Sequence, residues 1–144
     1  MKIRKAGKKD LKEVAELMIN EYSKPPFKEN EPIKNVLKSL KFYYNKAKIN
    51  IAEEDKKIIG VVVFQIEQWW EGQVIIIQDL AVNEKFQNKD VGKLLMKFVE
   101  RYALNKNVKR IYFGTNKKSS AIKFYKKLGY KIVKGKISMS KKLK

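Results

Sequence analysis

A polar loop between two apolar segments carries the residues best suited to hold an anion. The loop, residues 83–90, contains Lys85 and Lys89, and Gly92 follows it at the expected start of a helix. The first amides of a helix have no partner within the helix and lie at the positive end of its dipole, while glycine lets a ligand approach the backbone. The pattern therefore predicts a phosphate-binding loop.

The chain contains no histidine and no cysteine. A thiol nucleophile, a disulfide framework, a His-based catalytic triad and a zinc site are therefore excluded, and no metal is expected. Any general base must be a carboxylate, a water molecule, a tyrosinate or a lysine.

Two apolar segments must position the loop. Before it, residues 74–82 form a run of mostly β-branched and aliphatic side chains with one polar pair, Gln78 and Asp79, as expected of a strand buried on both faces. After it, apolar residues recur at helical spacing on one face, namely Val91, Leu94, Leu95, Phe98, Val99 and Tyr102. The expected unit is a strand, an anion-binding loop and a helix.

The same patterns predict the other elements. Strands are expected at residues 2–6, 49–52, 58–66 and 110–115, and helices near 11–22, 33–44 and 121–128. Residues 131–140 alternate enough for a closing hairpin around Gly135, followed by a solvated basic tail at 141–144. With 144 residues and no internal repeat or linker, the chain is expected to form one domain, 1–144.

Composition limits the class of protein. With 44% hydrophobic and 34% charged residues, and no apolar run long enough for a membrane span, a globular cytoplasmic protein is expected. The net charge of +19 comes almost entirely from lysines spread along the chain. Nucleic-acid-binding proteins more often cluster their charge and use arginine, so a general lysine bias explains this charge better than a nucleic-acid partner.

The loop also resembles a motif of a known family. Its residues 87–92, QNKDVG, are similar to the Gln/Arg-x-x-Gly-x-Gly/Ala pyrophosphate loop of the GNAT superfamily of acetyl-coenzyme A-dependent N-acetyltransferases. Residues 79–82 resemble the central strand of that family, and residues 92–95 resemble the start of its cofactor helix. Asp90 stands where the family usually has its first glycine.

A second stretch, residues 121–130, is similar to another GNAT signature, in which a helix ends at a glycine and an aromatic strand begins. Gly129 is the expected helix C-cap, and Tyr125 matches the tyrosine of the family. The usual asparagine of the family falls at Lys118 here, and Asn116 substitutes for it if the loop is longer.

The resemblance implies a single α/β GNAT-type domain with a mixed, twisted β-sheet, helices on both faces and a splayed central strand. It also implies acetyl-coenzyme A as co-substrate, with a β-bulge that admits the pantetheine arm beside the central strand. The cofactor-binding residues expected on this basis are Leu80, Ala81, Val82, Gln87, Asn88, Lys89, Asp90, Val91, Gly92, Lys93, Asn116 and Tyr125.

The implied reaction transfers the acetyl group to a primary amine of a small molecule or peptide by direct attack. Backbone amides near Leu80 and Val82 would stabilise the oxyanion, and Tyr125 would protonate the sulfur, although its position also suits a core tyrosine. The base is Asp79 or Glu67, acting directly or through water. Asp79 could equally satisfy backbone donors at a bulge or turn.

Aromatic residues are the candidates for the acceptor site. Trp69 and Trp70 could wall a pocket for a cationic amine, or one could cap the core while the other covers a dimer contact. Tyr43 could line the same pocket or pack against the sheet. Gln78 and Asp79 resemble the pattern of polyamine acetyltransferases, which usually have Glu-Asp there, but a basic protein suits a polycation poorly.

Two other functions stay open from the sequence alone. The first is a non-catalytic, lysine-rich RNA- or ribosome-associated domain that stacks bases on Trp69, Trp70 and Tyr43. The second is a GNAT fold that has lost activity, for which Asp90 and the displaced Asn116 are the warning signs. The oligomeric state is not determined by the sequence, and a homodimer is compatible with it.

Overall fold

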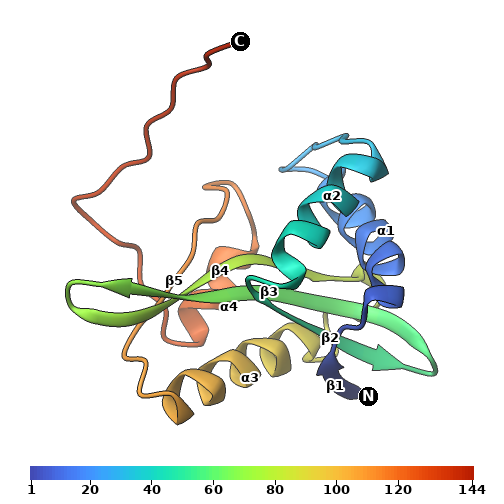
Figure 1. The fold of residues 1–144 in the computed structure, drawn as a ribbon, viewed down its shortest axis with the longest axis horizontal. Helices are drawn as coiled ribbons and strands as arrows, with labels where there is room; N and C mark the ends of the chain where they lie inside the picture. Colours follow the sequence, from blue (N-terminus) through green and yellow to red (C-terminus); the bar gives the residue numbers. More distant parts are fainter.

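The computed structural model describes all residues, 1–144. Five strands form one mixed sheet in the order β1-β2-β3-β4-β5 (Figure 1). The strands are β1 (Lys2–Lys5), β2 (Lys48–Glu54), β3 (Lys57–Trp69), β4 (Gly72–Val82) and β5 (Ile111–Tyr112). The helices are α1 (Leu11–Tyr22), α2 (Ile33–Tyr44), α3 (Val91–Asn105) and α4 (Ala121–Lys127), with 3-10 turns η1 (Lys8–Asp10) and η2 (Glu84–Phe86). No helix combines the length and the apolar character that crossing a membrane requires.

The sheet buries a separate core on each face. Because side chains alternate along a strand, Val61 and Val63 of β3 pack toward α1 and α2, whereas Val62 and Phe64 pack toward α3. Helix α1 contributes the apolar stripe Leu11, Val14, Ala15 and Met18 to the first core, as its spacing predicts. The prediction of an α/β domain with helices on both faces of a mixed sheet is confirmed.

The central strand β4 departs from its neighbours on both sides. It pairs with the antiparallel strand β3 over its whole length, but the register places Val63 opposite Asp79 and Phe64 opposite Ile77, which leaves Gln78 unpaired in a β-bulge. On its other side, β4 pairs with the parallel strand β5 only through Ile75 and Ile76. The two strands then separate, so the expected splayed central strand is confirmed.

The C-terminal prediction is wrong. Residues 131–144 form no strand and are exposed throughout, and Figure 1 shows this segment extending away from the rest of the molecule. An alternating pattern marks a chain that can form a strand, but a strand also needs to pair with the edge of another strand, and this segment pairs with none. The strand expected at 110–115 is also shorter than predicted, because β4 diverges from it after Tyr112.

Candidate active site

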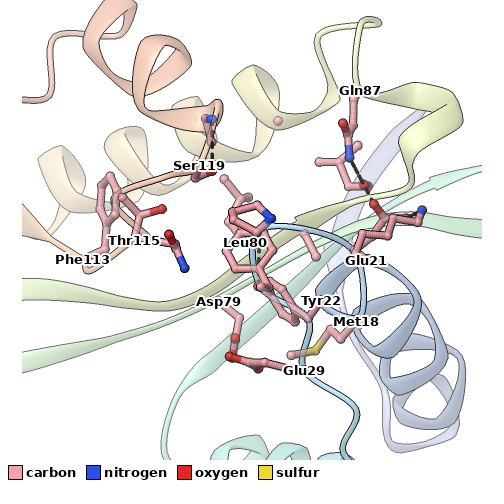
Figure 2. A pocket seen from close by; sticks show the side chains of 18 of the residues that line it. Met18, Glu21, Tyr22, Glu29, Asp79, Leu80, Gln87, Phe113, Thr115 and Ser119 are labelled. Carbon is pink, nitrogen blue, oxygen red and sulfur yellow. Dashed lines mark hydrogen bonds and ion pairs between the residues drawn. The ribbon is translucent and has the colours of Figure 1, made fainter.

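A cleft of about 1290 Å³ opens where β4 and β5 separate. Its walls include residues 77–82 of β4, residues 113–116 after β5, the start of α4, and the end of α1 with the segment that follows it. Figure 2 shows side chains from these four parts of the chain around one hollow. The cleft is large enough to hold an extended cofactor arm together with a small second substrate.

The open edge of β4 presents backbone donors to this cleft. The Tyr22 hydroxyl donates a hydrogen bond to the Leu80 carbonyl (3.1 Å), and the Gln87 side-chain amide donates one to the Val82 carbonyl (3.0 Å). In an antiparallel strand the N–H and C=O of one residue point to the same edge. The amides of Leu80 and Val82 therefore point away from β3 and into the cleft, while the Ala81 side chain is buried in the core.

Glu21, at the end of α1, ties the loop between β4 and α3 to the body of the protein. Its carboxylate is buried and accepts hydrogen bonds from the Gln87 side chain (3.1 Å), the Glu84 backbone amide (3.3 Å) and the Lys24 ammonium (3.1 Å). The Gln87 side chain is thus engaged within the protein. Sequence reasoning missed Glu21, because a carboxylate beside an apolar helix stripe looks like any solvent-facing residue.

Asp90 occupies a left-handed backbone position at the start of α3, with φ 64° and ψ 13°. This conformation explains why glycine is usual at this position, and aspartate is among the few other residues that adopt it readily. The exposed Asp90 side chain makes no capping hydrogen bond, so it leaves the first amides of α3 free for a ligand. The loop therefore keeps its shape without the glycine.

Other loop residues divide between the cleft, the solvent and the core. Asn88 and Gly92 line the cleft, and a Cβ on Gly92 would lie 3.3 Å from the Phe124 ring. Lys89 and Lys93 are exposed, whereas Val91 is buried beneath α3. Of this loop, Gln87, Asn88 and Gly92 therefore face the cleft.

Tyr125 reaches the cleft from α4. Its ring packs against Phe113, with centroids 4.5 Å apart, and against Phe124 at 5.2 Å. Burial raises the pKa of the Tyr125 hydroxyl to about 12, so it stays protonated at neutral pH. The hydroxyl has no hydrogen-bond partner in the protein, yet it is not sealed off from solvent. It is therefore free to donate a proton to a molecule in the cleft.

Asp79 lies on the cleft wall beside the bulge. Burial raises the pKa of its carboxyl group to about 6; the Tyr22 hydroxyl opposes that shift, and the charge of Glu29 adds to it. Figure 2 shows the carboxyl groups of Asp79 and Glu29 pointing toward one another. A carboxylate with a pKa near neutrality can both accept and release a proton at physiological pH.

Asn116, the residue expected to replace the usual asparagine of the family, also lines the cleft. Lys118, which stands at the usual position of that asparagine, is exposed and does not line the cleft. The Asn116 side-chain oxygen accepts a hydrogen bond from the Lys118 amide (2.8 Å), which closes a tight turn before α4. The amide nitrogen of Asn116 stays available to a ligand.

Four predicted site residues lie away from the cleft. Glu67 accepts a hydrogen bond from the Trp69 indole (3.0 Å) near the β3–β4 turn. It therefore lies apart from Asp79 and outside the cleft, where a second base would have to be. Trp69 stacks on Tyr112 at 4.7 Å, and Trp70 is fully exposed. Tyr43 packs against the core beneath α1 and α2, which was one of its two expected places. None of the four lines the cleft.

The chain matches known proteins both in sequence and in structure. The profile of the Acetyltransferase (GNAT) family matches residues 12–130. A possible acetyltransferase from Clostridium difficile 630 has a TM-score of 0.87 at 16% identity, covering 99% of this chain and 98% of that one. The aminoglycoside antibiotic 6'-N-acetyltransferase AAC(6')-IG from Acinetobacter haemolyticus has a TM-score of 0.82 at 16% identity, covering 100% of both chains.

A third structure is AAC(6')-Iy in complex with the bisubstrate analog CoA-S-monomethyl-acetylneamine, with a TM-score of 0.80 at 20% identity, covering 98% of this chain and 97% of that one. At such identities the structural matches establish the fold alone, whereas the family profile spans most of the sequence. The protein belongs to the GNAT acetyltransferase family.

Proposed function

We propose that the protein is an N-acetyltransferase that transfers the acetyl group of acetyl-coenzyme A to a primary amine of a small cationic molecule. The observation that carries this proposal is the content of one cleft. A carboxyl group of raised pKa, two backbone donors and a protonated tyrosine hydroxyl meet there, on Asp79, Leu80, Val82 and Tyr125. These are the groups that acetyl transfer to an amine requires.

The loop at the start of α3 fits a pyrophosphate group. Its first amides are uncapped by any side chain, they lie at the positive end of a long helix, and Gly92 lines the cleft there without a side chain of its own. Acetyl-coenzyme A, when bound, supplies the acetyl thioester. The residues that would hold it are the backbone of residues 87–93, the open edge of β4 and the side-chain amide of Asn116. The coenzyme A analog bound to AAC(6')-Iy supports this assignment.

Each cleft residue then has one task. Asp79 accepts a proton from the acceptor ammonium, directly or through water, which leaves a neutral amine able to attack. The Leu80 and Val82 amides donate hydrogen bonds to the carbonyl oxygen as negative charge develops on it. Tyr125 donates its proton to the sulfur as the carbon–sulfur bond breaks, and it regains a proton, through water, from the newly acetylated nitrogen, which must lose one to become an amide. The proton held by Asp79 is returned to solvent.

The charge of the cleft favours a cationic acceptor. Five carboxylates but only one basic residue line it, and that residue, Lys24, is paired with Glu21 (3.1 Å) and Glu84 (3.0 Å). The three other carboxylates, on Glu29, Glu31 and Asp79, have no basic partner. The expectation that a basic protein suits a polycation poorly considered only the total charge, whereas the local charge of the cleft is negative. Two structural relatives are named as aminoglycoside acetyltransferases, and aminoglycosides are small polycations of this kind.

The alternative of a base-stacking RNA-binding domain has less support. The aromatic residues that it needs lie on different elements, because Tyr43 packs on the α1–α2 side of the sheet and Trp69 and Trp70 lie at the β3–β4 turn. A stacking platform requires these rings on one shared surface.

Calorimetry with acetyl-coenzyme A tests the cofactor assignment. We expect the wild-type protein to bind, and Gly92→Glu to weaken binding by at least about tenfold, because a carboxylate would stand beside the pyrophosphate. Asn105→Glu is the matched control, since it adds the same charge at the other end of α3 and should bind normally. Circular dichroism checks that all three proteins fold. Unchanged binding by folded Gly92→Glu would refute the assignment.

A further inference from the structure

Tyr22, the last residue of α1, makes contacts in three directions. Its hydroxyl donates a hydrogen bond to the Leu80 carbonyl (3.1 Å) on the open edge of β4. Its ring packs edge-on against Phe27, with the ring centroids 5.4 Å apart. Its backbone carbonyl accepts a hydrogen bond from the Glu29 amide (2.8 Å). Tyr22 therefore joins the central strand to the segment between α1 and α2 (Figure 2).

The hydrogen bond to Leu80 lies where β4 has no neighbouring strand. Because β4 and β5 pair only through Ile75 and Ile76, no strand satisfies the polar groups of β4 beyond that point. A backbone carbonyl removed from water needs a donor. The Tyr22 hydroxyl supplies one, and it stays protonated at neutral pH because burial raises its pKa. The carbonyl is thereby satisfied, while the Leu80 amide stays free for a ligand.

The Tyr22 hydroxyl also acts on the neighbouring carboxyl group. Its hydrogen bond lowers the pKa of Asp79, whereas the charge of Glu29 raises it. The cross-strand partner of Asp79 on β3 is Val63, which carries no charge. Tyr125, which lines the cleft from α4, is neutral at physiological pH because burial raises its pKa to about 12. Of these groups, only the Tyr22 hydroxyl favours the ionised form of Asp79.

We propose that Tyr22 is a positioning residue, which holds the Asp79 carboxylate and the Leu80 amide in fixed places relative to one another. The need for such a residue comes from the bulge at Gln78, because a bulge interrupts the ladder that would otherwise fix the strand here. The inference rests on the proposed acetyl transfer, in which Asp79 deprotonates the amine that attacks the carbonyl held at Leu80. A small misplacement of either group lowers the rate of such a reaction steeply.

The test removes the hydroxyl and keeps the ring, in Tyr22→Phe. Tyr44→Phe is the matched control, because Tyr44 ends α2 as Tyr22 ends α1, packs against the same core and lies outside the cleft. For Tyr22→Phe at about pH 8 we expect kcat about tenfold lower and an unchanged KM for acetyl-coenzyme A. The acid limb of its turnover profile should move up from about 6 by about one pH unit, because the ionised carboxylate loses a hydrogen bond. Tyr44→Phe should change none of these quantities. Either normal kcat or an unmoved acid limb in Tyr22→Phe would overturn the proposal.

The titration of Asp79 in the free protein tests Tyr22 without any acceptor. The chain has four aspartates, so carboxyl-carbon NMR of aspartate-labelled protein gives few signals, and Asp79→Asn identifies the one from Asp79. Its midpoint should rise by about one pH unit in Tyr22→Phe and keep the wild-type value in Tyr44→Phe. An unmoved midpoint would overturn the proposal.

Two further outcomes separate this proposal from its neighbours. If Tyr22→Phe fails to fold while Tyr44→Phe folds, the proposal is overturned, because the hydroxyl then holds the fold rather than the site. If the wild type acetylates no amine, the proposed function fails, whereas the titration still decides whether Tyr22 holds Asp79.

Discussion

Replacing Asp79 with asparagine should lower activity and raise stability at the same time. Burial moves the pKa of this carboxyl group from 3.8 to about 6. Because a tenfold change in proton affinity is worth about 1.36 kcal/mol, ionising Asp79 in the folded protein costs up to about 3 kcal/mol more than in the unfolded chain. Asparagine has nearly the same shape and carries no charge. We therefore expect Asp79→Asn to gain about 1–3 kcal/mol of unfolding free energy where Asp79 is ionised.

The direction of the pH dependence follows from the raised pKa. Between the unfolded value and about 6 the folded protein binds the proton more tightly than the unfolded chain, so the Asp79 contribution to stability falls as pH rises. Below pH about 4 Asp79 is protonated in both the folded and the unfolded protein. A further fall in pH should therefore change the free energy of unfolding of the wild type and of Asp79→Asn equally. Above pH about 6 the full difference should appear. Turnover of the wild type should instead fall as pH drops through about 6, because a protonated Asp79 accepts no proton.

Two measurements check this pair of effects. Urea unfolding at about pH 4, 6 and 8 gives the stability difference, and thiol release from acetyl-coenzyme A gives turnover, which should fall by about 10²–10⁴-fold in Asp79→Asn. Glu29→Gln is a control that removes the neighbouring charge, so it should move the acid limb of the turnover profile to lower pH. If Asp79→Asn is less stable than the wild type at about pH 8, the reasoning fails, because the carboxylate must then be satisfying buried donors. If the variant keeps normal turnover, Asp79 is not the base.

Three further substitutions test other parts of the site. Tyr125→Phe keeps the ring and removes the hydroxyl, so turnover should fall by about 10²–10⁴-fold. The thermal midpoint and the affinity for acetyl-coenzyme A should change little. Normal turnover would show that Tyr125 is a packing residue only. Glu21→Gln weakens the hold on Gln87 and the loop, so KM for acetyl-coenzyme A should rise by about tenfold at nearly constant kcat, and an unchanged KM would contradict that positioning role. Asp90→Gly places a residue without a side chain in the left-handed backbone conformation of this position, so the free energy of unfolding should rise by up to about 1 kcal/mol. Binding of acetyl-coenzyme A should be preserved. Lost binding would show that the Asp90 side chain itself contributes to holding acetyl-coenzyme A.

The regular elements were predictable because each carries its own periodic pattern. Helices α1 and α2 span the residues expected for them, and β4 follows its apolar run from Val74 to the end. The bulge and the separation from β5 were expected only through the family resemblance. The C-terminal hairpin failed for a physical reason, since a strand pattern says nothing about which edge completes the strand.

The positions of single site residues were less predictable, because they depend on strand register and on which elements meet. Glu67 pairs across from Val74, whereas Asp79 pairs across from Val63, so the two carboxylates lie at separate places along the same pair of strands. Glu21 gains its role from a loop distant in sequence, which no local pattern reveals. The position of Tyr125 could be predicted because its sequence motif places it on a helix, and the spacing of the motif determines the face of the helix on which it lies.

A thiol-release assay over a panel of amines tests whether the protein transfers an acetyl group to a cationic amine. The panel combines polyamines and aminoglycosides with simple monoamines and with amino acids that carry a free carboxylate. We expect kcat/KM for the multiply charged amines to exceed that for the amino acids by at least about tenfold, because Glu29, Glu31 and Asp79 attract cations and repel carboxylates. If the protein binds acetyl-coenzyme A but no amine raises thiol release above the rate of acetyl-coenzyme A hydrolysis, the protein is not an N-acetyltransferase for these amines.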